Sequence, residues 1–328
     1  MTDLDVVAIG NALVYVITHA PYELVHDLGL EPGSMTLVDA ATVGELYAKL
    51  GPTTEISGGS AANTTAGIAS FGGAAGFIGR VADDDFGRIY THDLRSIGVH
   101  FAAPAAPADD TPTGRCLVIV TPDAQRTMST FLGAGSALDP SYVDRDLIAS
   151  AQVLYLEGYL WDQPPAMEAF RAASEAAHAA GRKVALSLSD SFCVDRHRET
   201  FLGLIESSVD ILFANEPEIT ALYEVGALAD AVGRVSDHVE VAALTHGATG
   251  STIVGRGGMH EVAAHPVERV VDTTGAGDLY AAGFLYGYTH GHDLPTCGAL
   301  ASLAAAEVIS HVGARPETTL ADLAAPLL

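Results

Sequence analysis

Short apolar runs rich in β-branched residues alternate along the chain with longer, alanine-rich stretches. The short runs predict buried strands, and the longer stretches predict the helices between them. Strand–helix–strand alternation at this spacing indicates an α/β domain with a mostly parallel sheet. The predicted strands are Val6–Ile9, Gly76–Val81, Val153–Leu156, Val184–Leu188, Ile211–Ala214 and Val241–Thr245, and the predicted helices include Ser60–Phe71, Pro165–Ala180 and Glu216–Tyr223.

Two regions interrupt this alternation with additional short strands. One region contains Val14–Thr18 and Met35–Asp39, and the other contains Arg115–Thr121 and Arg126–Phe131 on either side of a turn at 122–125. Four strands from two distant segments can form one small sheet. Because such a sheet cannot bury both of its faces alone, we expect it to cover the main domain as a lid.

The chain shows no internal repeat and no low-complexity linker between these regions. We therefore expect a single domain over residues 1–328, with a lid formed by two discontinuous segments, roughly 12–40 and 100–133. The most loop-like stretch is 104–114.

The charge balance narrows the classes of partner. The formal net charge is −25, with 16 lysines and arginines against 41 aspartates and glutamates, which argues against a nucleic-acid or anionic-membrane surface. No apolar run approaches the roughly 20 residues that span a bilayer, and the N-terminus lacks a basic signal region. Cys116, Cys193 and Cys297 show no paired spacing. We expect a cytoplasmic protein with reduced thiols, either a monomer or a homodimer.

A glycine turn near the C-terminus carries the first candidate chemistry. Gly275, Ala276 and Gly277 precede Asp278 and an apolar helix, so their amide groups can form a concavity for an anion at the helix start. A carboxylate beside that concavity suits a general base for a hydroxyl that attacks a phosphoryl group. We expect a positive φ at Gly277. The alternative is that Asp278 only favours the start of its helix.

A second glycine stretch opens another predicted helix. Gly58 and Gly59 allow close approach of a ligand, and Ser60 and Asn63 place polar side chains at the mouth of that helix. The alternative is a tight turn in which Ser60 is the N-cap. The chain has no Gly-Lys pair, so it is not an NTPase of the P-loop type.

Together these stretches resemble two signatures of the PfkB, or ribokinase-like, family of carbohydrate kinases. The signatures are GGSAANTTAGIASFGG and DTTGAGDLYAAGF, in the order that the family uses. Within the family the chain is most similar to adenosine kinases, through GNALV, LGLEPGSMTLVDAATVGELYAKL, DAQRTMSTFLGA and NEPE. The resemblance implies a Rossmann-like, three-layer α/β fold with a small β-sheet lid. It also implies transfer of the γ-phosphoryl group of ATP to a nucleoside 5′-hydroxymethyl group, most readily adenosine to AMP in purine salvage.

The resemblance assigns roles to individual residues. Asp278 matches the catalytic base, and Gly275, Ala276 and Gly277 match the anion hole. The matching substrate positions are Asn11, Gly59, Ser60 and Asn63 for the sugar, Leu13 and Leu37 for the apolar lid, and Arg126 for a lid arginine that reaches toward the phosphates. Leu13 and Leu37 can equally be lid core, and Arg126 can be a solvated hairpin charge.

The nucleotide half follows in the same way. Asn215 and Glu218 match the family's NxxE motif, in which the glutamate organises water around Mg²⁺; a helix cap is the competing interpretation of Asn215. The other matching positions are Thr245, Gly247 and Gly250 for ATP, and Asp272 and Thr274 for a monovalent cation such as K⁺. His290 and His292 lack a third spaced ligand, so a solvated loop is the better interpretation.

Tyr15 departs from the family pattern. Adenosine kinases carry an aspartate there, which accepts hydrogen bonds from the two vicinal ribose hydroxyls, and a neutral phenol cannot replace that bidentate acceptor. The phosphate half is unaffected. Two alternatives therefore stay open: a kinase for ribose, a ketohexose, inosine or guanosine, or a nucleoside-binding homologue with little turnover.

Overall fold

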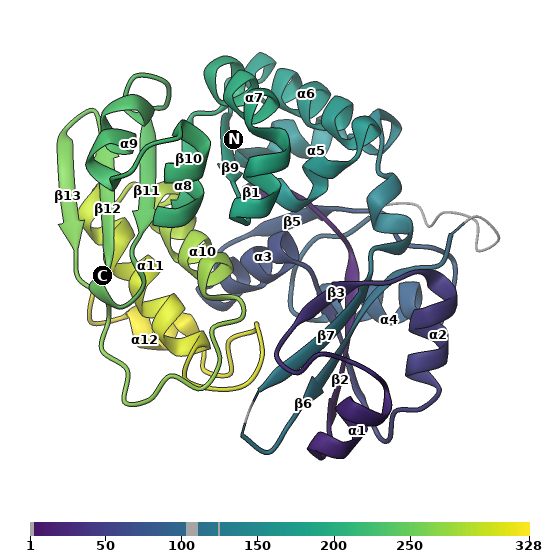
Figure 1. Ribbon diagram of the computed structural model, residues 1–328. Coiled ribbons are helices and arrows are strands. Elements are labelled where there is room, and N and C mark those ends of the chain that lie inside the picture. Colours follow the sequence, from purple (N-terminus) through teal and green to yellow (C-terminus); the bar gives the residue numbers. More distant parts are fainter. Residues whose placement is uncertain (1–2, 103–110, 124) are drawn as a thin grey trace.

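The computed structural model describes residues 3–102, 111–123 and 125–328, and its larger sheet has eight strands in the order β13-β12-β11-β10-β9-β8-β1-β5 (Figure 1). The six strands from β5 to β11 are parallel, whereas β12 and β13 add an antiparallel edge. The strands are β1 (Leu4–Ile9), β5 (Ala75–Ile78), β8 (Ala151–Glu157), β9 (Lys183–Ser187), β10 (Ile211–Asn215), β11 (Val241–Thr245), β12 (Ser251–Gly255) and β13 (Gly258–Val262).

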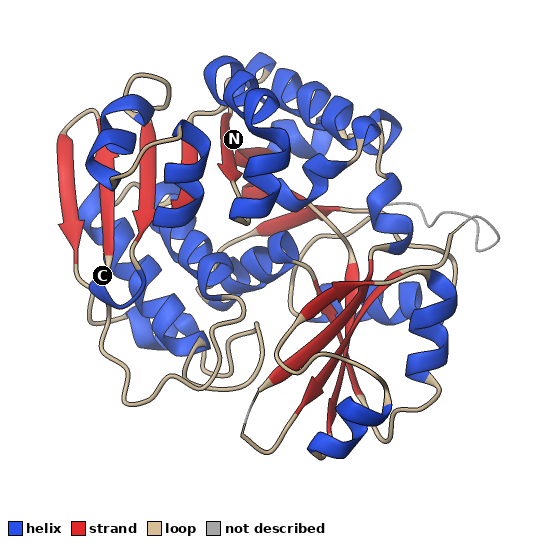
Figure 2. Ribbon diagram, in the orientation of Figure 1, coloured by secondary structure: helices blue, strands red, loops and turns tan. Residues whose placement is uncertain are grey.

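Helices cover both faces of this sheet (Figure 2). Strand β1 shows why: Val6 and Ala8 belong to one hydrophobic cluster, and Val7 and Ile9 belong to the other, so both faces of the strand are buried. One face packs on α5 (Arg145–Ser150), α6 (Pro164–Ala179), α7 (Ser191–Ser208), α8 (Glu216–Tyr223) and α9 (Leu228–Val235). The other face packs on α3 (Ser60–Ser70), α10 (Ala276–Thr289), α11 (Leu294–Val308) and α12 (Leu320–Ala324).

The smaller sheet has five strands in the order β3-β7-β6-β2-β4. They are β2 (Leu13–His19), β3 (Met35–Leu37), β4 (Thr54–Gly58), β6 (Gly114–Val120) and β7 (Arg126–Phe131), joined or flanked by α1 (Tyr22–Asp27), α2 (Ala40–Tyr47) and α4 (Asp85–Ser96). Alternate residues of β2 face opposite ways: Val14 and Val16 join the main cluster with α2, whereas Tyr15 and Ile17 join a small cluster that includes Val312. One face of this sheet therefore packs on α2, and the other packs against the core segment that contains Val312.

The α/β prediction is confirmed, and each predicted strand is present, with differences at the edges. Strand β5 ends at Ile78 rather than Val81, and β3 ends at Leu37 because Asp39 caps α2 by accepting the amide hydrogen of Thr42. The sequence pattern missed β4, β12 and β13, so the lid sheet has five strands rather than four. Part of the predicted loop, 104–110, lies outside the described residues.

Two further expectations can be compared with the structure. Cys116, Cys193 and Cys297 are all buried and unpaired, consistent with the predicted thiols. Among the helices of the described chain, none is long and apolar enough to span a membrane.

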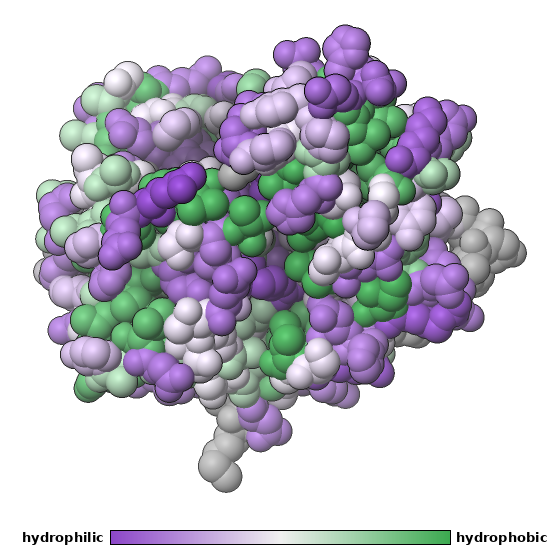
Figure 3. Space-filling model, turned by 90° about the horizontal axis from the view of Figure 1, so that it is seen from below, coloured by the Kyte–Doolittle hydropathy of each residue, from purple (hydrophilic) through white to green (hydrophobic). Residues whose placement is uncertain are grey.

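The strand order places a switch point between β1 and β8. The chain leaves β1 toward β5 on one side and continues from β8 toward β9 on the other, which opens a crevice beyond the carboxyl ends of these strands. Asn11 follows β1, and Glu157 ends β8, so both residues lie at this crevice. The face of the molecule seen from below is hollowed near its middle (Figure 3).

Candidate active site

A cavity of about 620 Å³ occupies the space between the carboxyl ends of the parallel strands and the lid. Its walls include fourteen of the positions predicted from the sequence: Asn11, Leu13, Tyr15, Leu37, Gly59, Ser60, Asn215, Glu218, Thr245, Thr274, Gly275, Ala276, Gly277 and Asp278. Five others lie off the cavity wall: Asn63, Arg126, Gly247, Gly250 and Asp272. The size is typical of a small-molecule site.

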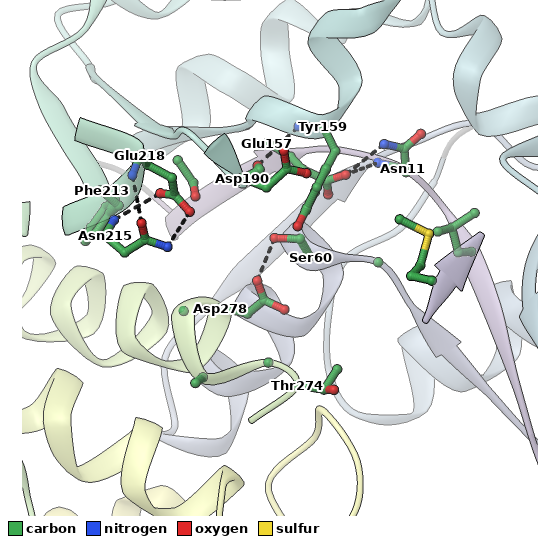
Figure 4. A pocket seen from close by; sticks show the side chains of 18 of the residues that line it. Asn11, Ser60, Glu157, Tyr159, Asp190, Phe213, Asn215, Glu218, Thr274 and Asp278 are labelled. Carbon is green, nitrogen blue, oxygen red and sulfur yellow. Dashed lines mark hydrogen bonds between the residues drawn. The ribbon is translucent and has the colours of Figure 1, made fainter. Parts of the chain in front are cut away.

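Asp278 lies in the first turn of α10 and points toward α3 (Figure 4). Ser60 Oγ donates a hydrogen bond to Oδ1 at 2.6 Å, and Asn63 Nδ2 donates one to Oδ2 at 2.8 Å. Burial raises the pKa of Asp278, and these two hydrogen bonds oppose that rise. Since the carboxylate makes no capping bond within its own helix, the interpretation of Asp278 as a helix-start residue alone does not account for its contacts.

Ser60 is the first residue of α3 rather than its cap. The N-cap is Gly59, at φ 100°, and a Cβ there would lie 2.1 Å from the carbonyl oxygen of Asn11. Only glycine fits this close approach. The turn therefore frees the Ser60 hydroxyl to reach Asp278, and the N-cap interpretation of Ser60 is wrong.

The turn before α10 is left-handed at Gly275, with φ 80°, and not at Gly277. A Cβ on Gly275 would lie 2.8 Å from the Ala314 side chain, whereas a Cβ on Gly277 would meet nothing within 4 Å. The expectation of a positive φ at Gly277 is therefore wrong. The amide of Ala276 donates to the Thr273 carbonyl oxygen at 3.2 Å, whereas those of Gly275 and Gly277 have no hydrogen-bond acceptor in the described chain.

Glu157 is a site residue that the sequence analysis missed. It is 1% exposed and accepts a hydrogen bond from Asn11 Nδ2 at 2.8 Å (Figure 4), and another from the Ala61 amide at 2.8 Å. It thereby ties the loop after β1 to the start of α3. Burial raises the pKa of Glu157 to about 7, and these hydrogen bonds limit the rise. The sequence did contain one signal for this residue: a charged side chain directly follows the apolar run Val153–Leu156 at the end of a predicted buried strand.

Asn11 also carries an unused acceptor. Its Nδ2 is engaged by Glu157, but its Oδ1 is buried without a hydrogen-bond partner in the described chain. A buried acceptor without a partner costs free energy. Because Asn11 lines the cavity, a hydroxyl group of a bound substrate would satisfy it.

Tyr15 faces the cavity from the lid, as its position in the motif predicted. Its ring lies against Gly58, where a Cβ would come within 2.6 Å of ring carbons, and its hydroxyl accepts a hydrogen bond from Asn63 Nδ2 at 3.4 Å. Burial, followed by the nearby charge of Asp278, raises the pKa of Tyr15 to about 12. The phenol is therefore neutral and can donate a hydrogen bond.

Arg126 is not a solvated hairpin charge. Its guanidinium lies 2.5 Å from Asp272 Oδ2, and the two side chains are 9% and 7% exposed. Asp272 Oδ1 also accepts the amide hydrogen of Thr274 at 3.1 Å, and Oδ2 accepts that of Gly313 at 3.0 Å. With both oxygens engaged and a guanidinium in contact, Asp272 does not fit the role of a free monovalent-cation ligand.

Asn215 and Glu218 form a complete capping box at the start of α8. Glu218 Oε1 and Oε2 accept the side-chain and main-chain N–H groups of Asn215 at 2.7 and 3.0 Å. The helix-cap interpretation of Asn215 is thus confirmed, and both residues also line the cavity. Burial raises the pKa of Glu218 to about 7. A carboxylate held in this way suits contact with Mg²⁺ through water, which Mg²⁺ retains readily.

Of the three other predicted ATP positions, one lines the cavity and two do not. Thr245 ends β11 at its wall, whereas Gly247 and Gly250 lie in the following turn and outside it. Gly250 has φ 107°, and a Cβ there would lie 2.1 Å from the Val262 carbonyl oxygen. The fold alone therefore explains why this position is a glycine. Nucleotide contact at these two glycines stays a prediction. Within the described ranges no cluster of three or more His, Cys, Asp or Glu side chains could hold a metal.

Two exposed aromatic side chains on the cavity wall were also missed. Tyr159 follows β8, Phe192 lies in the first turn of α7, and they are 40% and 75% exposed. Exposed aromatic faces on a cavity wall can stack on a flat ligand. Between them, Ser189 has φ 72°, and its hydroxyl accepts the amide hydrogen of Tyr159 at 3.1 Å, which links the two wall segments.

A family model described as the pfkB family carbohydrate kinase matches residues 35–320. The chain belongs to the PfkB family. It is therefore an ATP-dependent kinase whose substrate class is a sugar or a nucleoside. The ribokinase-like fold inferred from the two signatures is confirmed.

Solved structures and curated relatives support the same assignment. The chain is 46% identical to the adenosine kinase of Sinorhizobium meliloti, with a TM-score of 0.90 and 99% of each chain covered. It is 44% identical to a probable sugar kinase of Rhizobium etli CFN 42, with a TM-score of 0.91 and 100% of each chain covered. It is also 29% identical to the 5-dehydro-2-deoxygluconokinase of Geobacillus thermodenitrificans, over 78% of this chain and 79% of that one.

Proposed function

We propose that this kinase transfers the γ-phosphoryl group of ATP to the 5′-hydroxyl of a nucleoside, with adenosine as the preferred acceptor. Asp278 removes the proton from the attacking hydroxyl. The amides of Gly275 and Gly277 face the transferred phosphoryl group, with Ala276 completing the turn. Phosphoryl transfer depends mainly on positioning and charge stabilisation, and this constellation supplies both.

The observation that carries the choice of a nucleoside is the aromatic wall. Tyr159 and Phe192 expose ring surface at the same cavity that contains Asp278, and Leu13 and Leu37 add apolar surface from the lid. A simple sugar has no flat aromatic face to use this surface. A nucleobase does, and stacking of a base on an aromatic ring contributes about 1–3 kcal/mol.

The polar end of the cavity suits the ribose. Asn11 Oδ1 is an unused acceptor, Ser60 and Gly59 lie at the start of α3, and Asn63 holds Asp278 from behind. Mg²⁺ accompanies ATP, and Glu218 and Asn215 contact it through water. Thr245 lies at the nucleotide end with Gly247 and Gly250.

A second candidate function is phosphorylation of a sugar or sugar derivative. Two observations favour it: the similarity to 5-dehydro-2-deoxygluconokinases, and the neutral Tyr15 where adenosine kinases carry a ribose-binding aspartate. A neutral phenol offers one hydrogen-bond donor and only a weak acceptor, so it cannot make the bidentate contact with two vicinal hydroxyls that an aspartate makes.

A substrate panel separates the two candidates. Purified protein with ATP and Mg²⁺ is assayed for ADP release with adenosine, inosine, guanosine, ribose, fructose and 5-dehydro-2-deoxygluconate. The proposal predicts the highest kcat/KM for adenosine. A higher kcat/KM for any free sugar would replace the proposal with the second candidate, and tight adenosine binding by calorimetry without ADP release would identify a binding protein.

A further inference from the structure

Asp272 and Arg126 join the core to the lid through one ion pair. Asp272 lies just before α10 in the core, whereas Arg126 is the first residue of β7 in the lid. The two residues are 146 positions apart in the chain. Because both side chains are almost entirely shielded from solvent, at 9% and 7% exposure, water and salt screen their mutual attraction far less than in an exposed pair.

Asp272 shapes the turn that precedes Asp278. Its Oδ1 holds the Thr274 amide, and its Oδ2 holds the Gly313 amide, in the segment whose Ala314 packs against Gly275. The carboxylate therefore fixes the geometry of the turn. It also places a negative charge three residues before Gly275, next to a site for a phosphoryl anion, where like charges repel.

Arg126 cancels that charge. In the described chain no second cationic side chain lies within ion-pair distance of Asp272, and no second carboxylate pairs with Arg126. Burial lowers the pKa of the Arg126 guanidinium, and the charge of Asp272 opposes this. The guanidinium thus occupies the place beside Asp272 where a monovalent cation was expected from the family resemblance.

We propose that Arg126 is a positioning residue that supplies the counter-charge of Asp272, so that the anion hole is charge-balanced by lid closure and needs no monovalent cation. When the lid opens, Asp272 loses its partner and the hole becomes less favourable for phosphate. Closure of the lid and completion of the hole are then one event. The inference rests on the proposed anion hole at Gly275–Gly277.

The test compares Arg126→Met with the wild type in potassium chloride and in choline chloride at equal ionic strength. The wild type is expected to show the same kcat/KM in both salts. The variant is expected to lose at least about tenfold in choline, the equivalent of one 1.4 kcal/mol interaction, and to recover much of it in potassium. Arg115→Met is the matched control, because Arg115 is a lid arginine that stacks on Phe86 and does not contact Asp272.

Two further measurements separate this role from a merely structural one. Without nucleotide or acceptor, potassium should raise the melting temperature of Arg126→Met and leave that of the wild type unchanged. Adding Asp272→Asn to Arg126→Met should restore part of kcat/KM in choline, because the uncompensated charge is gone; this coupling is read from a double-mutant cycle. If Arg126→Met does not fold, Arg126→Lys is tested instead. Because lysine keeps the positive charge beside Asp272, this variant should keep full activity in choline.

Several results would overturn the inference. Activation or stabilisation of the wild type by potassium would show that a cation binds with Arg126 in place. A loss in Arg126→Met that neither potassium nor Asp272→Asn relieves would mean that Arg126 acts directly on the phosphates. If Asp278→Asn is also fully active, the proposed site itself is wrong; if only the salt effects fail, the site stands and this inference falls.

Discussion

Asp278 combines three properties at the scale of one residue: a cavity position, two hydrogen-bond donors from α3, and a helix start beneath it. Replacing it by asparagine keeps the shape but removes the proton acceptor. We predict that Asp278→Asn lowers kcat by about 10²–10⁴-fold, the usual cost of losing a general base. Affinity for ATP and acceptor, measured by calorimetry, should change little.

Asp293→Asn is the matched control for that variant. Asp293 caps α11 through the Thr296 amide on the surface, and asparagine caps equally well, so neither stability nor kcat should change. An Asp278→Asn enzyme with kcat within a few-fold of the wild type would remove Asp278 from the mechanism.

We propose that Tyr15 determines how well the sugar end of the cavity holds ribose. We predict that Tyr15→Asp raises kcat/KM for adenosine by an order of magnitude or more, because hydrogen bonds to a charged acceptor contribute roughly 1.5–3 kcal/mol each. The KM for ATP should barely change. Steady-state kinetics with the substrate panel check this. If the substitution instead damages turnover of another compound, Tyr15 recognises that compound, and no change with any acceptor would show that Tyr15 does not face the substrate.

Glu157 gives the protein a pH-dependent stability. Its pKa is raised from 4.5 to about 7 in the folded chain, so the folded state binds more protons than the unfolded state between these values. The free energy of unfolding should therefore fall as pH rises from about 4.5 to about 7, by about 3 kcal/mol at 1.4 kcal/mol per unit. Urea titrations of the wild type and Glu157→Gln measure the difference. A difference independent of pH would contradict the raised pKa.

At the scale of the element, the two glycines of the turn before α10 are under different steric constraints. Gly275 needs its left-handed φ and the space beside Ala314, whereas Gly277 has neither constraint in the folded chain. We predict that Gly275→Ala destabilises the fold by about 1–2 kcal/mol or more and lowers kcat, because a Cβ is strained at φ 80°. Gly277→Ala should leave the melting temperature unchanged, and any loss of its activity would then report contact with the phosphoryl group.

Hydrophobic patterning anticipated the elements that are buried on both faces. Strands β1 and β8 contain continuous apolar runs, Val6–Ile9 and Val153–Leu156, so the sequence identified them. Helix α8 was predicted with its observed bounds, Glu216–Tyr223. Strand β4 was missed because Thr54–Gly58 mixes polar and apolar residues and runs into Gly59. The antiparallel pair β12 and β13 was missed because its outer strand is half-exposed at the sheet edge.

The candidate site was predicted where local motifs carry it and missed where only the fold does. Asp278 and Gly275 lie in a contiguous signature. Glu157, Tyr159 and Phe192 reach the cavity because β8 and β9 end at the same edge of the sheet as β1, and no local pattern records that convergence. The ion pair between Arg126 and Asp272 depends on the lid docking against the core, which spacing along the chain cannot specify.

At the scale of the whole molecule, the candidate active site is a cavity between the two sheets, and residues from both sheets line it. The lid brings Leu37 and Tyr15 from one side, and the strand ends bring Asn11 and Glu157 from the other. Closing such a site excludes water, which limits wasteful hydrolysis of ATP. We therefore expect ATP hydrolysis without acceptor to be slow compared with turnover.

A competition assay tests the central claim most directly. The wild-type enzyme receives equal concentrations of adenosine and 5-dehydro-2-deoxygluconate with limiting ATP and Mg²⁺, and the phosphorylated products are quantified by mass spectrometry. The ratio of products gives the ratio of the two kcat/KM values without further assumptions. The account predicts AMP as the dominant product. Predominant phosphorylation of the sugar acid derivative, with little AMP, would contradict it.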